Sequence, residues 1–345
     1  MSNASSNSNV LTTVTTVLIY GGTSVNEIPL IGRFWMFLIS NCASFICSVF
    51  VLYYLLFDKN LRRGLNSHVL IVGLIFNLFA LVLDVPLVLY HLYHGIVWIQ
   101  VPIICVLWQY IDSVSYTVLP KLVAWASFER HILIFNEQRL LQSKNRILFH
   151  YIPIGVVAGY HILLYTTIYF IVPCHNIFDY TQTYCGYDSC VYETSFTIYE
   201  LFSNGVFSCV CIAFFNITLI VRVIYRKYRV QGHVDWHKHR KLTLQLLFVV
   251  SIFYIFYFPL VIVGVCRYIT GIKTFGSQYY VYGSFFSYYV NFLFPFGCVG
   301  TIPKLKTKTK KILLCWKIKP SAVGPRTVTN QQQRTGQTPM TAGIA

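Results

Sequence analysis

Acidic, basic and sulfhydryl side chains occur at helical spacing within one apolar stretch, residues 105–131. Asp112 and Arg130 are 18 positions apart, which corresponds to about five turns of an α-helix and a rise of roughly 27 Å. This rise is close to the hydrocarbon thickness of a bilayer, about 30 Å. Cys105 falls within about 20° of the same helix face. Because charged side chains inside hydrocarbon are costly and usually functional, we expect Asp112 and Arg130 to act at opposite ends of one membrane-spanning helix.

Lys121 lies in the same stretch but about 180° away from that helix face. It follows Pro120, whose missing N–H leaves a backbone carbonyl free. The ammonium group can bond to a freed carbonyl or face the fourth or fifth apolar run. The sequence assigns Lys121 no function.

The elements that must position these residues are long apolar segments. Of the 345 residues, 56% are hydrophobic and 11% are charged, whereas soluble proteins have about 25% charged residues. Apolar runs long enough to cross a bilayer recur along the chain. We therefore predict an all-α membrane protein, a seven-transmembrane helix bundle with a short amphipathic eighth helix. The seven runs are 34–57, 65–92, 101–134, 147–172, 195–226, 238–266 and 277–301.

The distribution of charge orients this bundle. The net charge is +16, and most lysines and arginines lie in the first, third and fifth connections and in the C-terminal tail. The positive-inside rule then places the N-terminus outside and the C-terminus in the cytoplasm, and we expect the plasma membrane as the location. Basic residues that flank membrane spans do not require nucleic acid as a partner. The outer half holds seven acids and three bases, which favours a cationic ligand.

The two ends of the chain differ from the apolar runs in composition. The N-terminal segment is rich in Ser, Thr and Asn, and Asn3 fits the Asn-X-Ser/Thr glycosylation pattern. After the seventh run, mixed Lys and apolar residues predict a helix on the cytoplasmic leaflet, in which Cys315 is a palmitoylation candidate. The last residues are rich in Gly, Pro, Thr and Gln, which is typical of disorder. The predicted units are 1–33 (extracellular tail), 34–302 (seven-helix domain), 303–316 (amphipathic cytoplasmic helix) and 317–345 (disordered cytoplasmic tail).

The third apolar run ends in the triplet Glu129-Arg130-His131, and Cys105 lies 25 positions before Arg130. In the rhodopsin-like G-protein-coupled receptors, an acid–Arg–aromatic triplet ends the third helix, and a loop-bonded cysteine lies the same distance before the Arg. Together with seven runs, an outside N-terminus and a basic surface helix, these residues resemble that family. The resemblance covers about residues 34–316.

Two prolines also match the family, while several other positions depart from it. Pro259 and Pro295 match its proline hinges in the sixth and seventh helices. The family's Asn-Pro-x-x-Tyr motif reads Phe-Pro-Phe-Gly-Cys here, starting at Phe294, and its helix-six Trp is replaced by Tyr257. The chain therefore resembles a divergent member whose activation switches differ from the usual ones.

The resemblance implies a ligand site in the outer half of the bundle. Asp112 matches the position that holds a cationic group in amine and some peptide receptors, and Tyr288 matches the residue that steadies this acid. Tyr116 and Tyr257 would form an aromatic floor suited to cation–π contact, and Glu200 would contribute from the fifth helix. An extracellular amine or peptide is therefore the expected ligand. The alternative for Asp112 is an internal polar link that only positions helices.

The resemblance also implies a coupling site for a heterotrimeric G protein at the inner end. Arg130 would contact the G protein, His131 completes the motif, and Glu129 would neutralise Arg130 in the resting state. The sixth helix lacks the acid that often pairs with this Arg, so Thr243 would offer a weaker hydrogen bond. Outward movement of that helix about Pro259 would open a cytoplasmic cleft. The alternative is that Arg130 merely extends its charge to the membrane interface.

The outer cysteines are expected to form disulfides. Cys105 lies at the top of the third run, and the loop 173–194 holds three more cysteines on the oxidising side of the membrane. The resemblance pairs Cys105 with a cysteine of this loop, and we expect Cys185 or Cys190. The sequence leaves the connectivity open.

A seven-span transporter or a membrane enzyme is the alternative function. Transporters usually carry internal repeats and helices broken at the midplane, and the sequence shows neither. A zinc hydrolase needs clustered His or Asp ligands, but the three histidines between 233 and 239 are better explained as a solvated basic linker. We therefore expect no catalytic activity, no cofactor and no metal, and a bilayer, an extracellular ligand and a G protein as partners.

Overall fold

The computed structural model covers the apolar runs and most of their connections. All described residues belong to one compact unit, Met1–Ile302. They form helices and short connections without β-strands, so the all-α prediction is confirmed for this part of the chain. The described residues are 29–62, 64–135, 143–173, 178–186, 194–229, 236–272 and 274–299.

Several predictions concern residues outside these ranges. The glycosylation candidate Asn3, the alternative disulfide partner Cys190 and the palmitoylation candidate Cys315 are among them. The predicted cytoplasmic helix and tail, residues 303–345, also lie outside the described part, as does most of the N-terminal segment. These predictions therefore stand as they were made from the sequence.

Most of the apolar runs form helices long enough to cross a membrane. Among the described residues, five helices meet this criterion by length and composition, and a bent pair makes a sixth if it is counted as one span. The seventh run instead forms two helices of 11 residues each, with a break between them at Tyr288. A multi-pass helical protein with five or six membrane-length spans is thus shown, whereas seven spans are not. The five helices are Leu30–Phe57, Ser67–His94, Pro102–Ile132, Ile147–Ile171 and Ser195–Arg222, and the bent pair is Gln245–Phe256 with Phe258–Thr270.

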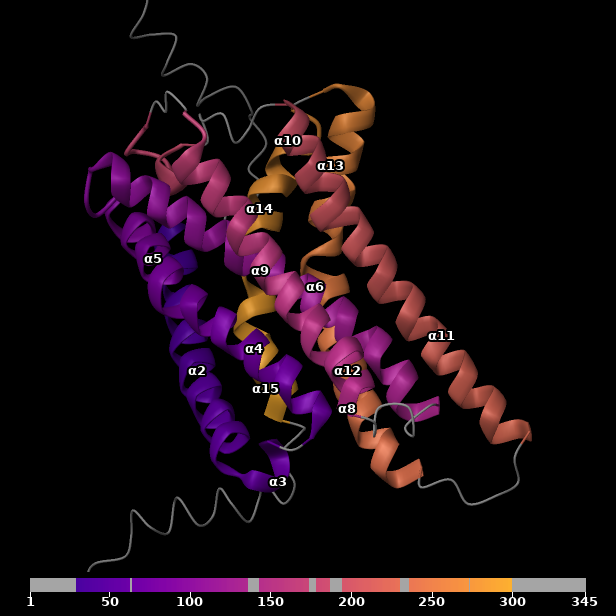
Figure 1. Cartoon of the computed structure of the whole chain (residues 1–345). Helices are drawn as coiled ribbons and strands as arrows, with labels where there is room; N and C mark the ends of the chain where they lie inside the picture. The colour runs from indigo at the N-terminus through magenta and orange to yellow at the C-terminus, as the bar shows by residue number, and fades with distance from the viewer. Residues whose placement is uncertain are drawn as a thin grey trace, which may run out of the picture. The chain divides into compact units, whose positions relative to one another are not determined.

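Figure 1 shows the spans as helices. Their hydrogen bonding divides them into α-helical and π-helical segments. The elements of the first three runs are α2 (Leu30–Phe57), α3 (Lys59–Arg62), α4 (Leu65–Phe79), π-helical η1 (Ala80–Asp84), α5 (Val85–His94) and α6 (Pro102–Phe135). The fourth run and the outer loop hold α8 (Ser143–Arg146), π-helical η2 (Ile147–Tyr151), α9 (Ile152–Thr166), π-helical η3 (Thr167–Ile171) and the short turn η4 (Thr183–Cys185). The remaining elements are α10 (Thr194–Tyr199), π-helical η6 (Glu200–Val206), α11 (Phe207–Arg229), α12 (Trp236–Phe256), α13 (Phe258–Thr270), α14 (Ser277–Ser287) and α15 (Tyr289–Val299).

The third span, α6, contacts more of the other elements than any other span does. It contacts α4, α9, α11 and α12, and it also meets the outer-loop turn η4. Buried side chains fill the space around it, among them Trp108 near its outer end and Leu122 near its middle. Large apolar side chains stay exposed along α2, α9 and α11, as contact with lipid requires. Residues on α6 are therefore positioned by several spans at once.

Prolines interrupt the regular hydrogen bonding of two spans. Pro86 lies in the first turn of α5, directly after the π-helical turn η1, where the Val85 N–H reaches back to the Ala80 carbonyl. Pro259 lies in the first turn of α13, and the chain bends by 41° between α12 and α13. In the seventh run, α15 continues through Pro295. The sixth run is thus bent where a hinge was expected, whereas the seventh is broken seven residues before its proline.

Candidate functional site

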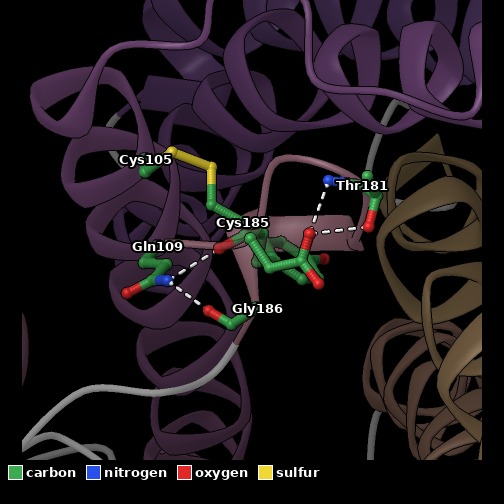
Figure 2. The surroundings of a disulfide bond; sticks show 7 residues. Cys105, Gln109, Thr181, Cys185 and Gly186 are labelled. Atoms are coloured by element: carbon green, nitrogen blue, oxygen red, sulfur yellow. Dashed lines mark hydrogen bonds between the residues drawn. A yellow bond between two sulfur atoms is a disulfide. The ribbon is translucent and has the colours of Figure 1, made fainter. Parts of the chain in front are cut away.

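One face of α6 holds the outer loop in place. Cys105, Trp108, Gln109 and Asp112 follow the spacing i, i+3, i+4 and i+7, so their side chains lie along one stripe of the helix. Figure 2 shows the upper part of this stripe, where Cys105 and Gln109 face the loop segment around Cys185. Cys105 and Asp112, the outer part of the stripe predicted from the sequence, thus lie along one face of α6, and this part of the helix meets a loop.

Two links fix the backbone of that loop. Cys105 and Cys185 form a disulfide, which selects one of the two expected pairings. The Gln109 side chain donates from Nε2 to the carbonyls of Tyr184, at 2.7 Å, and Gly186, at 3.1 Å (Figure 2). Tyr184 and Cys185 have left-handed backbone conformations, with φ of 58° and 59°, which cost about 1–2 kcal/mol for a residue other than glycine. The disulfide and the amide together hold these two residues in that conformation.

Asp179 stabilises the same loop at its solvent-exposed surface. Its carboxylate accepts hydrogen bonds from the Thr181 hydroxyl at 2.6 Å, from the Thr181 backbone N–H at 3.0 Å and from the Gln182 side chain at 2.8 Å. These hydrogen bonds stabilise the charged form and lower the pKa of Asp179. A compact, self-bonded loop thus precedes Tyr184.

The Tyr184 side chain points from the loop into the bundle. Its ring packs against Trp108 with 4.9 Å between centroids. Its hydroxyl donates to Asp112 Oδ1 at 3.4 Å and is also hydrogen-bonded to the Tyr288 hydroxyl at the break between α14 and α15. Asp112 and Tyr288 therefore lie together and interact directly. Tyr184, which the sequence did not single out, is hydrogen-bonded to both.

A second buried acid, Asp84, lies beside this group. It is only 1% exposed, and the Trp108 indole donates to its Oδ1 at 2.7 Å. Its carboxylate interacts electrostatically with Asp112 and with Tyr288. Neither acid forms an ion pair with any residue that the structure describes. The outer part of the bundle therefore holds two neighbouring carboxyl groups, and a cation that enters there can pair with their ionised form.

The predicted aromatic floor is present one turn deeper. Tyr116 and Tyr257 meet edge to face, with centroids 5.2 Å apart and an angle of 71° between the ring planes. Tyr257 is the residue at which α12 ends and α13 begins, so this contact joins α6 to the bend of the sixth run. The Tyr116 ring thus connects the Asp112 region to the element that is expected to move.

Glu200 belongs to a different polar cluster. It accepts hydrogen bonds from the Tyr165 hydroxyl on α9 and from Asn204 Nδ2 at 3.1 Å. Asn204 Oδ1 in turn lies 3.4 Å from His161 Nε2. Glu200 therefore links the fourth and fifth spans and makes no hydrogen bond to Asp112, although the two carboxylates interact electrostatically.

Lys121 completes the cluster on the opposite side of α6. Its Nζ donates to the Ser203 carbonyl in the π-helical segment η6 and lies 5.0 Å from the centroid of the Phe207 ring. A π-helical turn leaves carbonyls outside the regular α-helical hydrogen bonding, and this ammonium group satisfies one of them. Lys121 thus faces the fifth span, which was one of the two options considered from the sequence.

At the inner end of α6, Glu129 is hydrogen-bonded to His150, which in turn contacts His68. Its Oε1 lies 2.5 Å from His150 Nδ1, and His150 Nε2 lies 3.1 Å from His68 Nδ1. Glu129 and His150 are both buried. The carboxylate that was expected to neutralise Arg130 thus takes its hydrogen bond from the fourth span, and it acts on Arg130 only through the electrostatic interaction between neighbours.

Arg130 is 4% exposed and lines a small pocket. Among the described residues, its Nε and Nη1 have no hydrogen-bond partner, and the same holds for both polar atoms of the Gln245 side chain on α12. Both side chains line this pocket, which has about 20 Å³ accessible to the centre of a water-sized sphere. Such a pocket is large enough for a water molecule. The sixth run therefore faces Arg130 with Gln245, and the side chain of Thr243, two residues earlier, is outside the described part.

His131, the last residue of the triplet, binds a third element. Its Nε2 lies 2.6 Å from the Phe215 carbonyl on α11. The inner end of α6 is thereby attached to α11 through His131 and to η2 through the Glu129–His150 pair. Arg130 lies between these two attachments and lines the pocket together with Glu129.

The described residues thus bring together acids and phenols near the outer end of α6 and a buried arginine near its inner end. No group of three or more His, Cys, Asp or Glu side chains that could hold a metal ion occurs in this part of the chain. In comparisons with known proteins, no family model matches the chain and no curated sequence matches it significantly.

Proposed function

We propose that the chain is a divergent rhodopsin-like G-protein-coupled receptor that spans the plasma membrane seven times, with its N-terminus outside and its C-terminus in the cytoplasm. It binds an extracellular amine or short cationic peptide and activates a heterotrimeric G protein. One observation supports this most directly: α6 carries Asp112, in contact with phenols from two other segments, and the buried Arg130, on the same helix. A single rigid helix thus connects a ligand region with a coupling region.

The ligand site is supported by the charge and chemistry around Asp112. Two acids, Asp84 and Asp112, interact electrostatically without an ion-pair partner among the described residues. A cationic group of a ligand supplies the missing positive charge, and the faces of Tyr116 and Tyr257 below offer cation–π contact. Neutralising buried acids provides part of the binding free energy.

The coupling site is supported by the surroundings of Arg130. Its donor atoms and the Gln245 side chain meet in one pocket without direct hydrogen bonds, so α12 is not locked to α6 by an ion pair there. Movement of α12 about the bend at Tyr257 separates Gln245 from Arg130 and exposes the guanidinium group. Its free donors then bind carbonyls or a carboxylate of the G protein.

Guanine-nucleotide exchange in membranes from cells that express the full chain tests this proposal. A panel of amines and short cationic peptides is applied to wild type, Asp112→Asn, Arg130→Ala and Arg222→Ala, the last being an exposed arginine on α11. We expect at least one agonist, whose potency falls in Asp112→Asn and whose stimulation is lost in Arg130→Ala but kept in Arg222→Ala. Unchanged agonist-driven exchange in Arg130→Ala contradicts the coupling role.

The same membranes distinguish the transporter alternative. In sealed vesicles, a transporter accumulates its substrate whether or not a G protein is present. A compound of the panel that is accumulated without stimulating exchange favours transport, whereas stimulated exchange without accumulation favours the receptor.

A further inference from the structure

Tyr184 occupies the place that the proposed ligand needs. Its hydroxyl lies between the Asp112 carboxylate and the Tyr288 hydroxyl, and its ring covers Trp108. We propose that Tyr184 is a built-in occupant of the ligand site: its phenol holds the position at Asp112 that the ligand's cationic group takes on binding. This inference rests on the receptor function proposed above.

The way in which Tyr184 is held distinguishes an occupant from an ordinary core residue. Its main chain is fixed from both sides, because Gln109 binds the carbonyls of Tyr184 and Gly186 and the next residue is tied to Cys105. These links fix the backbone, whereas the side chain is held separately by Trp108, Asp112 and Tyr288. Rotation about the Cα–Cβ bond withdraws the phenol from the bundle without breaking the disulfide or either Gln109 hydrogen bond. The anchored loop thus places a movable ring over the site.

The contact between Tyr184 and Asp112 is weaker than the one that a ligand can offer. The phenol meets the carboxylate at 3.4 Å, which is long for an O–H···O hydrogen bond. An ammonium or guanidinium group forms a shorter, charge-assisted hydrogen bond with the same carboxylate. A cation therefore displaces the phenol, whereas a neutral molecule of the same size lacks this advantage.

Displacement of the Tyr184 ring also indicates which group the ligand carries next to its cationic centre. When the Tyr184 ring leaves, the face of Trp108 that it covered becomes available. A ligand with an aromatic or apolar group next to its cationic centre fills this space and restores the lost packing. The inferred ligand class is thus a cation with an adjacent apolar or aromatic face.

Access of a cationic probe to the site tests the occupant role without any agonist. The reporter is Tyr116→Cys, one turn below Asp112 on α6, in the full chain at the surface of intact cells. The probe is the trimethylammonium-ethyl methanethiosulfonate reagent, whose sulfur is attacked by the introduced thiolate to form a mixed disulfide while methanesulfinate leaves. Peptide mass spectrometry measures the modification at position 116 and separates it from that of native cysteines.

Three reporter chains are compared: one without a further change, one with Tyr184→Ala and one with Tyr180→Ala. Tyr180 is on the same loop and is attached through its backbone, because its carbonyl accepts a hydrogen bond from the Val97 N–H in the connection between α5 and α6. We expect Tyr184→Ala to accelerate modification at least tenfold, and Tyr180→Ala to leave the rate within about twofold. A fourth chain, Tyr184→Phe, keeps the ring on Trp108 and removes only the hydroxyl, so we expect a smaller acceleration. Surface labelling confirms that each chain reaches the membrane.

Equal rates in the Tyr184→Ala and Tyr180→Ala reporters overturn the occupant role, and so does a reporter thiol that remains unmodified in every chain. Neither result concerns nucleotide exchange, so the receptor proposal is tested separately by its own assay. Conversely, if Tyr184→Ala opens the site but no cationic compound stimulates exchange, the occupant role stands and the proposed signalling function fails.

Discussion

Replacing Trp108 by Phe tests the buried hydrogen bond that holds the second span against α6. The indole donates to Asp84 Oδ1 at 2.7 Å, and both residues are 1% exposed. A buried acceptor that loses its donor costs about 1–3 kcal/mol, and the smaller ring loses about 1 kcal/mol of packing. We therefore expect Trp108→Phe to lower the free energy of unfolding by about 3 kcal/mol.

Thermal unfolding of the purified full chain in detergent measures this loss. For a chain of this size, 1 kcal/mol corresponds to about 2 °C, so Tm should fall by about 6 °C. Trp98→Phe is the matched control, because Trp98 is 61% exposed and substitutions at such sites usually change stability by less than about 0.5 kcal/mol.

A double-mutant cycle separates the hydrogen bond from the packing. With Asp84→Leu in place, the acceptor is gone, so adding Trp108→Phe should cost only the packing part, about 1 kcal/mol. The difference of about 2 kcal/mol between the two backgrounds is the coupling energy. If Trp108→Phe costs the same with and without Asp84, the hydrogen bond contributes nothing and the reasoning is refuted.

Five further substitutions give stability predictions that the same thermal assay measures. Gln245→Leu should raise the free energy of unfolding by about 1 kcal/mol, because it removes two unpartnered buried polar atoms. Gln109→Leu should lower the free energy of unfolding, because two carbonyls lose their donor. A less stable Gln245→Leu chain together with a more stable Gln109→Leu chain contradicts the assignment of these partners. Gly297→Ala should destabilise, since a Cβ there would lie 2.6 Å from a methyl group of α12, while Gly155→Ala, with nothing within 4 Å, should be neutral or stabilising. His150→Phe should cost about 3 kcal/mol because it leaves a buried carboxylate without its partner, and a loss below about 1 kcal/mol speaks against that pair.

Helical periodicity and hydropathy predicted much of the fold. The third run was expected at 101–134 and forms Pro102–Phe135, because a long apolar stretch has one low-energy conformation in a membrane. The break at Tyr288 was not predicted, since no proline or glycine marks that position in the sequence. Hydropathy measures the length of an apolar stretch and not its straightness.

The candidate site was predicted where its residues share one helix or match positions of the family that the sequence resembles. Asp112 and Tyr288 were paired through the resemblance, whereas Tyr184 between them was missed because residue type rarely signals a positive φ in a tyrosine. The bond from Glu129 to His150 was also missed, since the two are 21 residues apart and only the packing of α6 against η2 brings them together. Tertiary contacts of this kind leave no periodic pattern in the sequence.

The π-helical turns in the second, fourth and fifth spans affect how this chain lines up with others. A turn that closes from i to i+5 holds one residue more than an α-helical turn, so the side chains beyond it are advanced by one position around the axis. Glu200 begins the longest of these turns, η6. If the fifth span is aligned residue by residue with a helix that has no such turn, the residues that follow Glu200 are assigned to the wrong helix face. A sequence alignment of these spans with regular α-helices therefore needs a one-residue gap at each π-helical turn. Such a gap falls inside a helix, where alignments normally do not allow gaps.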